Sequence, residues 1–225
     1  THDNPAEGAL LGALRVLADA GAEMRDIEGV IHGTTLATNA LIEKRGARVA
    51  TITTDGFRDI LEIAYERRYS QYDINLIKTD LLVARDRALT VPERMSAAGA
   101  VILPLDESCV PALLEQLDAT GAKAVAICLL HSYANAAHEE RLRDLLQAAR
   151  PDLVVSISSE VSPEAREFDR LCTTVANAYI QPMMARYLDA FAELFVKEGL
   201  KCPILMMTAG GGMTTLRTAA QLPIR

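Results

Sequence analysis

A run of histidine, glycine, hydroxyl and amide side chains at residues 32–40 has the residue types of a site for an oxygen-rich ligand. It reads His-Gly-Thr-Thr-Leu-Ala-Thr-Asn-Ala and follows a short stretch of strand length. The glycine lets the backbone turn, and the threonines then open a helix whose first N–H groups have no partner within the helix. Such N–H groups and hydroxyls can donate to an anion or a carbonyl oxygen. Helix capping by Thr34 or Thr35 explains the same threonines without a ligand.

A second polar set, His131, Ser132 and Tyr133, follows the apolar run 123–130. An uninterrupted apolar run of this length predicts a strand buried on both faces of a parallel sheet, and ligands collect at the carboxyl ends of such strands. The adjacent His and Ser invite a hydrolase interpretation. However, neighbouring strand residues point to opposite faces, whereas a nucleophile and its base need direct hydrogen-bond contact. A role in structuring the loop therefore explains these residues better.

Two further strand ends carry small or hydroxyl residues. Residues 158–163 read Ser-Ser-Glu-Val-Ser-Pro, and helix capping by Ser162 accounts for them as well as a functional role does. Residues 208–212 read Thr-Ala-Gly-Gly-Gly, between a predicted strand and a predicted short helix. Without Cβ atoms, the glycine amides could approach a phosphate, although the segment matches neither the P-loop nor the dinucleotide-binding pattern.

Composition and charge exclude several classes of protein. Half of the 225 residues are hydrophobic and 24% are charged, which suits a globular chain with its own core. The formal net charge of −7 leaves no broad basic surface for nucleic acid. No apolar run reaches the ~20 residues that cross a bilayer, so no membrane partner is expected. The 4 cysteines show no metal-ligand spacing, so no metal site is predicted, and free thiols fit a cytoplasmic location.

Periodicity predicts the elements that position these residues. Asn4, Pro5 and Glu7 mark the start of an amphipathic helix that ends at Gly21. Strands are then predicted at 29–32, 48–53, 123–130, 153–157 and 204–207, and helices at 34–45, 57–67, 108–119, 137–150 and 163–198. This alternation predicts an α/β fold with a mostly parallel sheet.

Two places interrupt the alternation. Residues 68–101 are polar and lack a helical period, so we expect an inserted loop and a hairpin with strands at 89–95 and 100–103. Pro182 lies inside the last long helix and predicts a kink or two consecutive helices there.

Taken in order, these motifs resemble those of the hydantoinase/oxoprolinase family. The run at 32–40 is similar to the most recognisable block of that family. Further segments that match in order are 53–59, 91–94, 130–133, 138–140, 158–163 and 177–179. The resemblance is to an internal part of the large ATP-dependent subunit and extends over about residues 5–220.

The resemblance implies a partial actin-like, ribonuclease-H-like ATPase fold of the α/β class with an inserted hairpin. It also implies two segments, an N-terminal-type domain at residues 1–175 and the start of a second domain at 176–225. Members of the family are thought to use ATP and Mg²⁺ to phosphorylate an amide or ketone oxygen, which creates a better electrophile. A second, B-type subunit or domain then completes ring opening or carboxylation.

The motifs and the resemblance together single out His32, Thr35 and His131 as candidate catalytic residues. The candidate substrate- or nucleotide-binding residues are Gly33, Thr34, Thr38, Asn39, Gly210, Gly211 and Gly212. The first phosphate loop of the family should precede Asn4, and a second acidic Gly-Gly-Thr segment should follow Arg225, so we expect this chain alone not to turn over ATP. Alanine replaces the usual asparagine at position 209, which removes a polar side chain but keeps the backbone role.

Three functions are compatible with these residues. The leading one is the activating subunit of an ATP-dependent cyclic-amide hydrolase, such as a hydantoinase or a 5-oxoprolinase. The second is a subunit of an ATP-dependent ketone carboxylase, and the third is a non-catalytic binding or assembly module. The expected partners of either enzyme are a small cyclic amide or ketone and a second subunit. The phosphate loops on either side of this segment would separate an enzyme from the third possibility.

Overall fold

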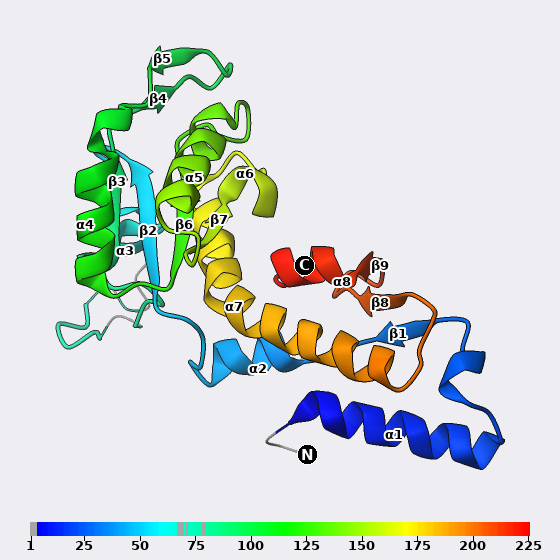
Figure 1. Cartoon of the computed structure of the whole chain (residues 1–225). Helices are drawn as coiled ribbons and strands as arrows, with labels where there is room; N and C mark the ends of the chain where they lie inside the picture. The colour runs from blue at the N-terminus through cyan, green and yellow to red at the C-terminus, as the bar shows by residue number, and fades with distance from the viewer. Residues whose placement is uncertain (1–3, 67–69, 71, 78–79) are drawn as a thin grey trace. The chain divides into compact units, whose positions relative to one another are not determined.

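The computed structural model describes residues 4–66, 70, 72–77 and 80–225, which form two compact units (Figure 1). The first unit contains the residues up to Arg45 together with 180–223 and Arg225. The second contains residues 46–179 and Ile224. The chain leaves the first unit after Arg45 and returns to it within one long helix, α7 (Glu167–Lys197).

The second unit is built on a parallel sheet with the strand order β3-β2-β6-β7. Its strands are β2 (Val49–Thr54), β3 (Ala88–Val91), β6 (Ala124–Cys128) and β7 (Val154–Ile157). Every residue of β2 and β6 is buried, as expected for central strands covered on both faces. The predicted α/β fold with a mostly parallel sheet is confirmed.

Helices cover both faces of this sheet. The apolar sides of α4 (Val110–Thr120) and α5 (Ala137–Ala149) share one core with alternate residues of the strands. The first part of α7 lies on the opposite face, where the Asn177 amide donates to the Ser156 hydroxyl at 3.0 Å. The remaining elements of this unit are α3 (Ile60–Ile63), η2 (Arg85–Arg87), β4 (Arg94–Met95), β5 (Val101–Leu103), η3 (Glu107–Cys109) and α6 (Ser158–Val161).

The first unit has a smaller sheet with the strand order β1-β8-β9. β1 is parallel to β8, and β9 is antiparallel to β8. Its elements are α1 (Pro5–Ala20), η1 (Met24–Asp26), β1 (Val30–His32), α2 (Leu36–Ile42), β8 (Ile204–Met207), β9 (Met213–Thr215) and α8 (Leu216–Gln221). Apolar residues of the second part of α7, such as Leu188 and Phe191, form the cores of this unit.

The ends of α1 follow the predicted signals. The Asn4 side chain accepts a hydrogen bond from the Glu7 N–H, and Pro5 occupies the first turn. Gly21 ends the helix in the left-handed conformation, with φ of 64°. The capping residues therefore determine both ends of this helix locally.

The residues predicted as one inserted hairpin belong to two sheets. The first part of the predicted strand 89–95 is β3, which joins the edge of the parallel sheet beside β2, so that prediction is wrong. Pro92 has no N–H and cannot continue the ladder, which separates β3 from β4. The hairpin that remains pairs β4 with β5 around Gly99, whose φ is 80°. Residues 67–69, 71 and 78–79 of the preceding insertion lie outside the described residues.

Two helices are shorter than predicted because left-handed residues end them. The helix predicted at 34–45 is reduced to α2, and Lys44 has a φ of 54° just beyond it. The helix predicted at 57–67 is only 4 residues long in the structure, where it is α3. Ala64, with a φ of 50°, ends α3. Apolar spacing alone does not reveal these backbone reversals.

The helix predicted to start at Pro163 begins later. Ser162 follows α6, and α7 starts at Glu167, so the predicted cap at Ser162 is wrong. The segment before α7 has other partners: the Glu164 N–H donates to the Ser162 carbonyl at 2.7 Å, and the Glu164 carbonyl accepts from the Arg170 side chain at 2.6 Å. Pro182 does not divide the helix in two, because α7 is one helix of 31 residues that contains it.

Gly46 provides a test of close packing within the second unit. A Cβ built on Gly46 would lie 2.2 Å from the ring of Tyr179, which is itself buried. We expect Gly46→Ala to lower the free energy of unfolding by about 1–3 kcal/mol through overpacking. Urea unfolding of the 225-residue chain measures the change.

Gly12→Ala is the matched control for this substitution. Gly12 lies inside α1, and no atom lies within 4 Å of a Cβ built there. Alanine should therefore raise the free energy of unfolding by about 0.5–1 kcal/mol, because it restricts the unfolded chain. Equal effects of the two substitutions would contradict the close contact at Gly46.

Candidate functional site

In the first unit, two of the predicted segments lie at the same edge of one sheet. His32 ends β1 and pairs with Met206 of β8, so both strands have their carboxyl ends there. A Cβ built on Gly33 would lie 3.8 Å from the Cβ of Met207. The structure thus brings the turn after His32 beside the glycine loop at 208–212. Gly33 and Thr35 in the turn are exposed, as are Thr38 and Asn39 in α2.

The His32 imidazole is half-buried and held by aromatic residues of α7. Its Nε2 lies 2.7 Å from the Tyr187 hydroxyl, and its ring stacks on Phe191 with 4.3 Å between centroids. Burial lowers the pKa of His32 below 6.5, so the neutral imidazole predominates at neutral pH. Burial also raises the pKa of Tyr187, although its hydrogen bond with Thr34 lowers that pKa to a smaller extent. His32 is therefore a neutral, oriented side chain at this edge.

The two threonines of the turn differ. Thr34 Oγ1 accepts a hydrogen bond from the Leu36 N–H at 3.2 Å, which confirms the capping role considered for it. Thr35 occupies the N-cap position of α2 but makes no capping hydrogen bond with its side chain. Because Thr35 is also exposed, its hydroxyl is the better placed of the two to bind a ligand.

The glycine loop is the turn of a hairpin. The loop is followed by β9, which pairs with β8, and α8 comes only after β9. The prediction that the loop leads directly from a strand into a helix is therefore wrong. Four N–H groups of the loop already donate within the chain: Thr208 to the Gly212 carbonyl, Ala209 to the Arg225 carbonyl, Gly211 to the Thr208 carbonyl and Gly212 to Thr208 Oγ1. These bonds fix the loop and leave fewer amides for a phosphate than the sequence suggests.

A groove of about 650 Å³ lies along α2 in the first unit. Asn39, one of the predicted binding residues, contributes to its lining. The other lining residues are Pro5, Leu36, Ala40, Glu43, Arg45 and Met183. A lining of amide, charged and apolar side chains suits a small ligand with both polar and apolar parts.

His131 belongs to the second unit, where it lies in the turn after β6. Its φ is 57°, in the left-handed region that residues with a Cβ rarely adopt. Its Nδ1 lies 3.5 Å from the Tyr133 hydroxyl. The buried Ser132 hydroxyl lies instead 3.0 Å from that of Ser158. The two side chains have different partners, so a Ser–His nucleophile pair has no support in the structure.

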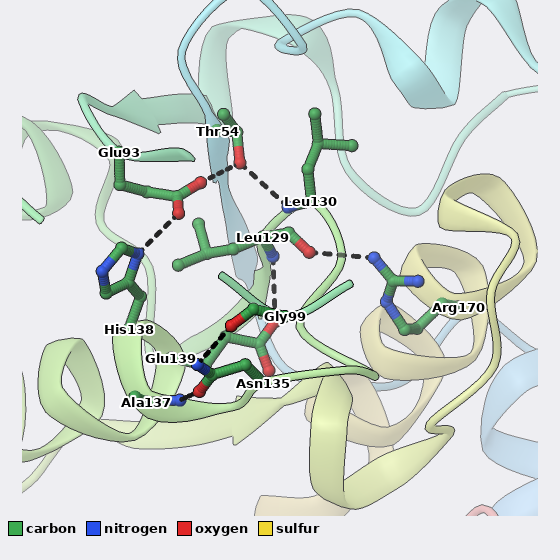
Figure 2. Close-up of polar contacts among 10 residues, drawn as sticks. All are labelled: Thr54, Glu93, Gly99, Leu129, Leu130, Asn135, Ala137, His138, Glu139 and Arg170. Atoms are coloured by element: carbon green, nitrogen blue, oxygen red, sulfur yellow. Dashed lines mark hydrogen bonds and ion pairs between the residues drawn. The ribbon is translucent and has the colours of Figure 1, made fainter. Parts of the chain in front are cut away.

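The Glu139 carboxylate is completely buried beside the turn after β6 (Figure 2). It accepts hydrogen bonds from the Leu129 N–H at 2.8 Å, the Ser158 hydroxyl at 2.7 Å and the Ser159 N–H at 2.8 Å. Burial raises the pKa of Glu139 above its ordinary value of 4.5, because desolvation outweighs these bonds. Arg170 is also completely buried, and it donates to the Ser158 hydroxyl at 3.0 Å and to the Leu129 carbonyl at 2.9 Å.

A second buried carboxylate, that of Glu93, lies in the same region (Figure 2). It accepts a hydrogen bond from the Thr54 hydroxyl, and its Oε2 lies 2.7 Å from Nδ1 of His138. Thr54 Oγ1 accepts in turn from the Leu130 N–H at 2.9 Å. These contacts join the end of β2 to the turn after β6.

The importance of Glu93, Glu139 and Arg170 was not anticipated from sequence. They come from distant parts of the chain, so no local spacing marks them as a group. One signal was present: Glu139 shares a helix face with Leu142 and Leu146, which are both completely buried. A charged residue on the apolar face of a helix is expected to have a buried partner.

Within the described residues, no group of three or more His, Cys, Asp or Glu side chains could hold a metal ion. Several exposed acidic residues pair with arginines instead, as Glu107 does with Arg141 at 2.8 Å. None of the described helices is long and apolar enough to cross a membrane.

Two family models match the sequence. The model described as the hydantoinase/oxoprolinase N-terminal region matches residues 1–149, and the model described as hydantoinase/oxoprolinase matches residues 170–225. The first match includes the turn after His32 and the turn at His131, and the second includes the glycine loop.

Individual relatives are longer than this chain. Caprolactamase subunit alpha from Pseudomonas jessenii is 36% identical over 84% of this chain and 27% of its own length. The acetophenone carboxylase gamma subunit from Aromatoleum aromaticum is 31% identical over 83% of this chain and 27% of its own length. 5-oxoprolinase 1 from Arabidopsis thaliana is 31% identical over 83% of this chain and 16% of its own length. The chain therefore spans less than a third of each of these relatives.

A solved structure shows the same fold. The crystal structure of the ATP-dependent caprolactamase from Pseudomonas jessenii aligns with a TM-score of 0.82 at 34% identity. The alignment covers 91% of this chain and 30% of that one.

The buried Glu139 carboxyl should make stability depend on pH. The pKa of Glu139 is raised in the folded state. The stabilisation that the protonated carboxyl contributes to the fold is therefore fully present below pH 4.5 and is lost as the pH rises through the folded-state pKa. Glu139→Gln cannot ionise and lacks this dependence. The free energy of unfolding of the wild type relative to Glu139→Gln should therefore fall as the pH rises above 4.5.

Urea unfolding across this pH range measures the difference. Glu140→Gln makes the same chemical change at the next residue, which is exposed, and should show no such fall. The raised pKa of Glu139 would be refuted if the difference in free energy of unfolding between the wild type and Glu139→Gln stayed constant or grew in favour of the wild type as the pH rises.

Proposed function

The chain belongs to the hydantoinase/oxoprolinase family, and on that premise we propose that it forms the substrate-activating part of an ATP-dependent enzyme that opens a cyclic amide. The observation that carries this proposal is the sheet edge of the first unit, where the exposed turn after His32 lies beside the glycine loop. The names caprolactamase and 5-oxoprolinase both denote enzymes that act on cyclic amides. The whole enzyme is larger than this chain.

The proposal includes an actin-like, ribonuclease-H-like ATPase fold. Its support is the parallel sheet between helix layers in the second unit and the likeness to an ATP-dependent caprolactamase. We assign residues 1–175 to an N-terminal-type domain and 176–225 to the start of a second domain.

The chemistry proposed is activation of a carbonyl oxygen. An amide is a weak electrophile, and phosphoryl transfer from ATP to its oxygen converts that oxygen into a leaving group. In the first unit, the exposed Thr35 hydroxyl and Asn39 amide would bind oxygen atoms of the ligands, with Thr38 beside them. His32 would orient the substrate as a neutral hydrogen-bonding group.

The described residues fit part of a nucleotide. No atom lies within 4 Å of a Cβ built on Gly210 or Gly211, so the exposed backbone there leaves room for a phosphate. ATP would supply the phosphoryl group. Mg²⁺ bound with a nucleotide is usually held by phosphate oxygens and one or two carboxylates, and no step of the reaction is assigned to a metal held by this chain alone.

A second, B-type subunit or domain would complete ring opening. The support is that two relatives are named as subunits, alpha in caprolactamase and gamma in acetophenone carboxylase.

All four cysteines are free thiols, which favours a reducing, cytoplasmic location.

A ketone carboxylase is the second candidate function. The 31% identity to the acetophenone carboxylase gamma subunit favours it. Both reactions could begin with phosphoryl transfer from ATP to a carbonyl oxygen, with release of ADP. In an amide this makes the carbonyl carbon electrophilic, whereas a ketone also loses an α-proton and becomes an enol phosphate, the precursor of the carbon nucleophile that attacks CO2.

Thr35→Val in the full-length parent enzyme tests the turn, because it removes one hydroxyl with little change in volume. We expect substrate-dependent ATP hydrolysis to fall roughly ten- to hundredfold, since a hydrogen bond to a charged group contributes about 1.5–3 kcal/mol. Thr35→Ser keeps the hydroxyl and should restore most of the rate. Phosphate release is measured in the presence of the partner subunit.

The choice of substrate separates the candidate functions. Stimulation by hydantoin, 5-oxoproline or caprolactam supports the cyclic-amide hydrolase, whereas stimulation only by a ketone with bicarbonate supports the carboxylase. Absence of any stimulation would indicate a non-catalytic module. A wild-type rate in Thr35→Val would remove the turn from the active site.

The 225-residue chain by itself should not hydrolyse ATP. Its glycine loop has few amides left for a phosphate, and its described residues contain no metal-binding cluster. Substrate-dependent phosphate release from this chain alone would contradict the expectation.

A further inference from the structure

The small sheet of the first unit has one face packed against helices. Side chains alternate between the two faces along a strand, and Val30 pairs with Ile204, so Val30, Ile204 and Met206 lie on the same face. Val30 and Ile204 pack into a core formed mainly by α1 and α7, and Met206 packs into a core formed by α7 and α8. These three helices therefore cover this face of the sheet.

The opposite face of the same sheet carries apolar side chains that are exposed. Ile31 pairs with Leu205, and Met207 pairs with Met213, so these four residues lie on it in two neighbouring rows. Ile31 is 58% exposed, Met207 49% and Met213 58%, and Leu205 is partly buried. Single apolar side chains are ordinary on a protein surface, whereas a contiguous group of them marks a surface that binds another element. We call the four residues the open face.

The parallel pairing of β1 with β8 makes an apolar open face unusual. Parallel strands occur almost only in sheets that are covered on both faces, because their connections place helices there. Antiparallel sheets can leave one face to water, but that face then carries polar side chains. Thr215, opposite Leu205, is a polar neighbour of the open face. The four apolar residues therefore have the composition of a surface that is buried in a complete protein.

The position of Arg225 indicates which part of a longer protein lies nearest to the open face. Its carbonyl accepts a hydrogen bond from the Ala209 N–H at 3.1 Å, and Ala209 is the second residue after Met207. The backbone at Arg225 therefore lies at the carboxyl end of β8, next to the open face. At the other end of the chain, α1 packs against α7 on the covered side of the sheet.

A tethered segment has an advantage over a separate molecule in covering this face. The chain spans 27% of the length of the caprolactamase alpha subunit and 27% of that of the acetophenone carboxylase gamma subunit, so a parent protein of similar length has ample further polypeptide. A segment joined to Arg225 by a short linker is present at an effective concentration on the order of millimolar. This favours such a segment over a second copy of the chain or a separate subunit.

We propose that the polypeptide that follows Arg225 in the parent protein covers the open face with the apolar side of a helix. This inference concerns the assembly of the parent protein and does not require the proposed reaction. Because Gly33 lies beside Met207, the same helix would form a wall next to the turn after His32. The candidate site of the first unit would then be complete only in the parent protein.

Oxidation of methionine by hydrogen peroxide tests whether the face is covered. Met207 and Met213 lie on the open face, and Met206, on the covered face, is 4% exposed and serves as the internal control. In the 225-residue chain, Met207 and Met213 should form the sulfoxide at least ~tenfold faster than Met206. In the dilute full-length parent subunit without its partner, all three should react equally slowly. Tandem mass spectrometry of proteolytic peptides measures each rate.

Three results of the oxidation experiment would overturn the proposal. Equal rates for the three methionines in the 225-residue chain would show that the face is not open. Fast oxidation of Met207 and Met213 in the parent subunit and in its complex would show that the face stays free. Protection that requires the partner subunit, or that is lost on dilution, would assign the face to that subunit or to a second copy.

Photo-crosslinking identifies the covering segment. With p-benzoylphenylalanine in place of Met207, irradiation of the parent subunit should produce a crosslink to a residue after Arg225 of the same polypeptide. The same photoreactive residue in place of Val16, which is 66% exposed on α1, is the control and should not reach that segment.

The crosslinked partner decides the proposal. A crosslink from position 207 to polypeptide before Thr1, to the partner subunit or to a second copy would overturn it, as would no crosslink or the same crosslink from position 16. Neither experiment requires turnover. A parent enzyme that is inactive with every candidate substrate would therefore overturn the proposed function and leave this inference standing.

Discussion

The second unit depends on the hydrogen bonds between Leu129 and two buried ionisable side chains, with the Leu129 N–H donating to Glu139 and the Leu129 carbonyl accepting from Arg170. Glu139 comes from α5 and Arg170 from α7, which lie on opposite faces of the sheet. They meet at the peptide groups where β6 ends, so the two helix layers are joined through the backbone of the central strand. Because both side chains are out of water, each depends on its hydrogen bonds to the backbone and to the Ser158 hydroxyl for compensation. The turn at His131 and the packing of the layers are therefore coupled.

The first unit uses a different principle at its sheet edge. Its polar groups at the ends of β1 and β8 are exposed or half-buried, and neutral partners hold them. Tyr187 orients His32, and Thr34 caps the short helix that follows. Such groups can exchange water for a ligand at small cost, whereas the buried charges of the second unit cannot. On the proposed function, the first unit binds oxygen-rich ligands at this edge.

The relatives indicate which step this part of the protein would contribute. The caprolactamase alpha subunit, the acetophenone carboxylase gamma subunit and 5-oxoprolinase 1 match 83–84% of the chain, although their names denote different reactions. A requirement common to lactams and ketones is activation of a carbonyl oxygen. On the proposed function, this chain contributes to that common step.

Local signals in the sequence determined the capped helix α1, the buried strand β6 and the polar turn after His32, because caps and apolar runs act over a few neighbouring residues. The α/β class followed from the same signals. Tertiary structure alone decided that β3 joins the parallel sheet, that the glycine loop closes a hairpin, and that Glu93, Glu139 and Arg170 converge on the turn after β6. These features depend on contacts between residues far apart in the chain, and the spacing of neighbouring residues does not predict such contacts.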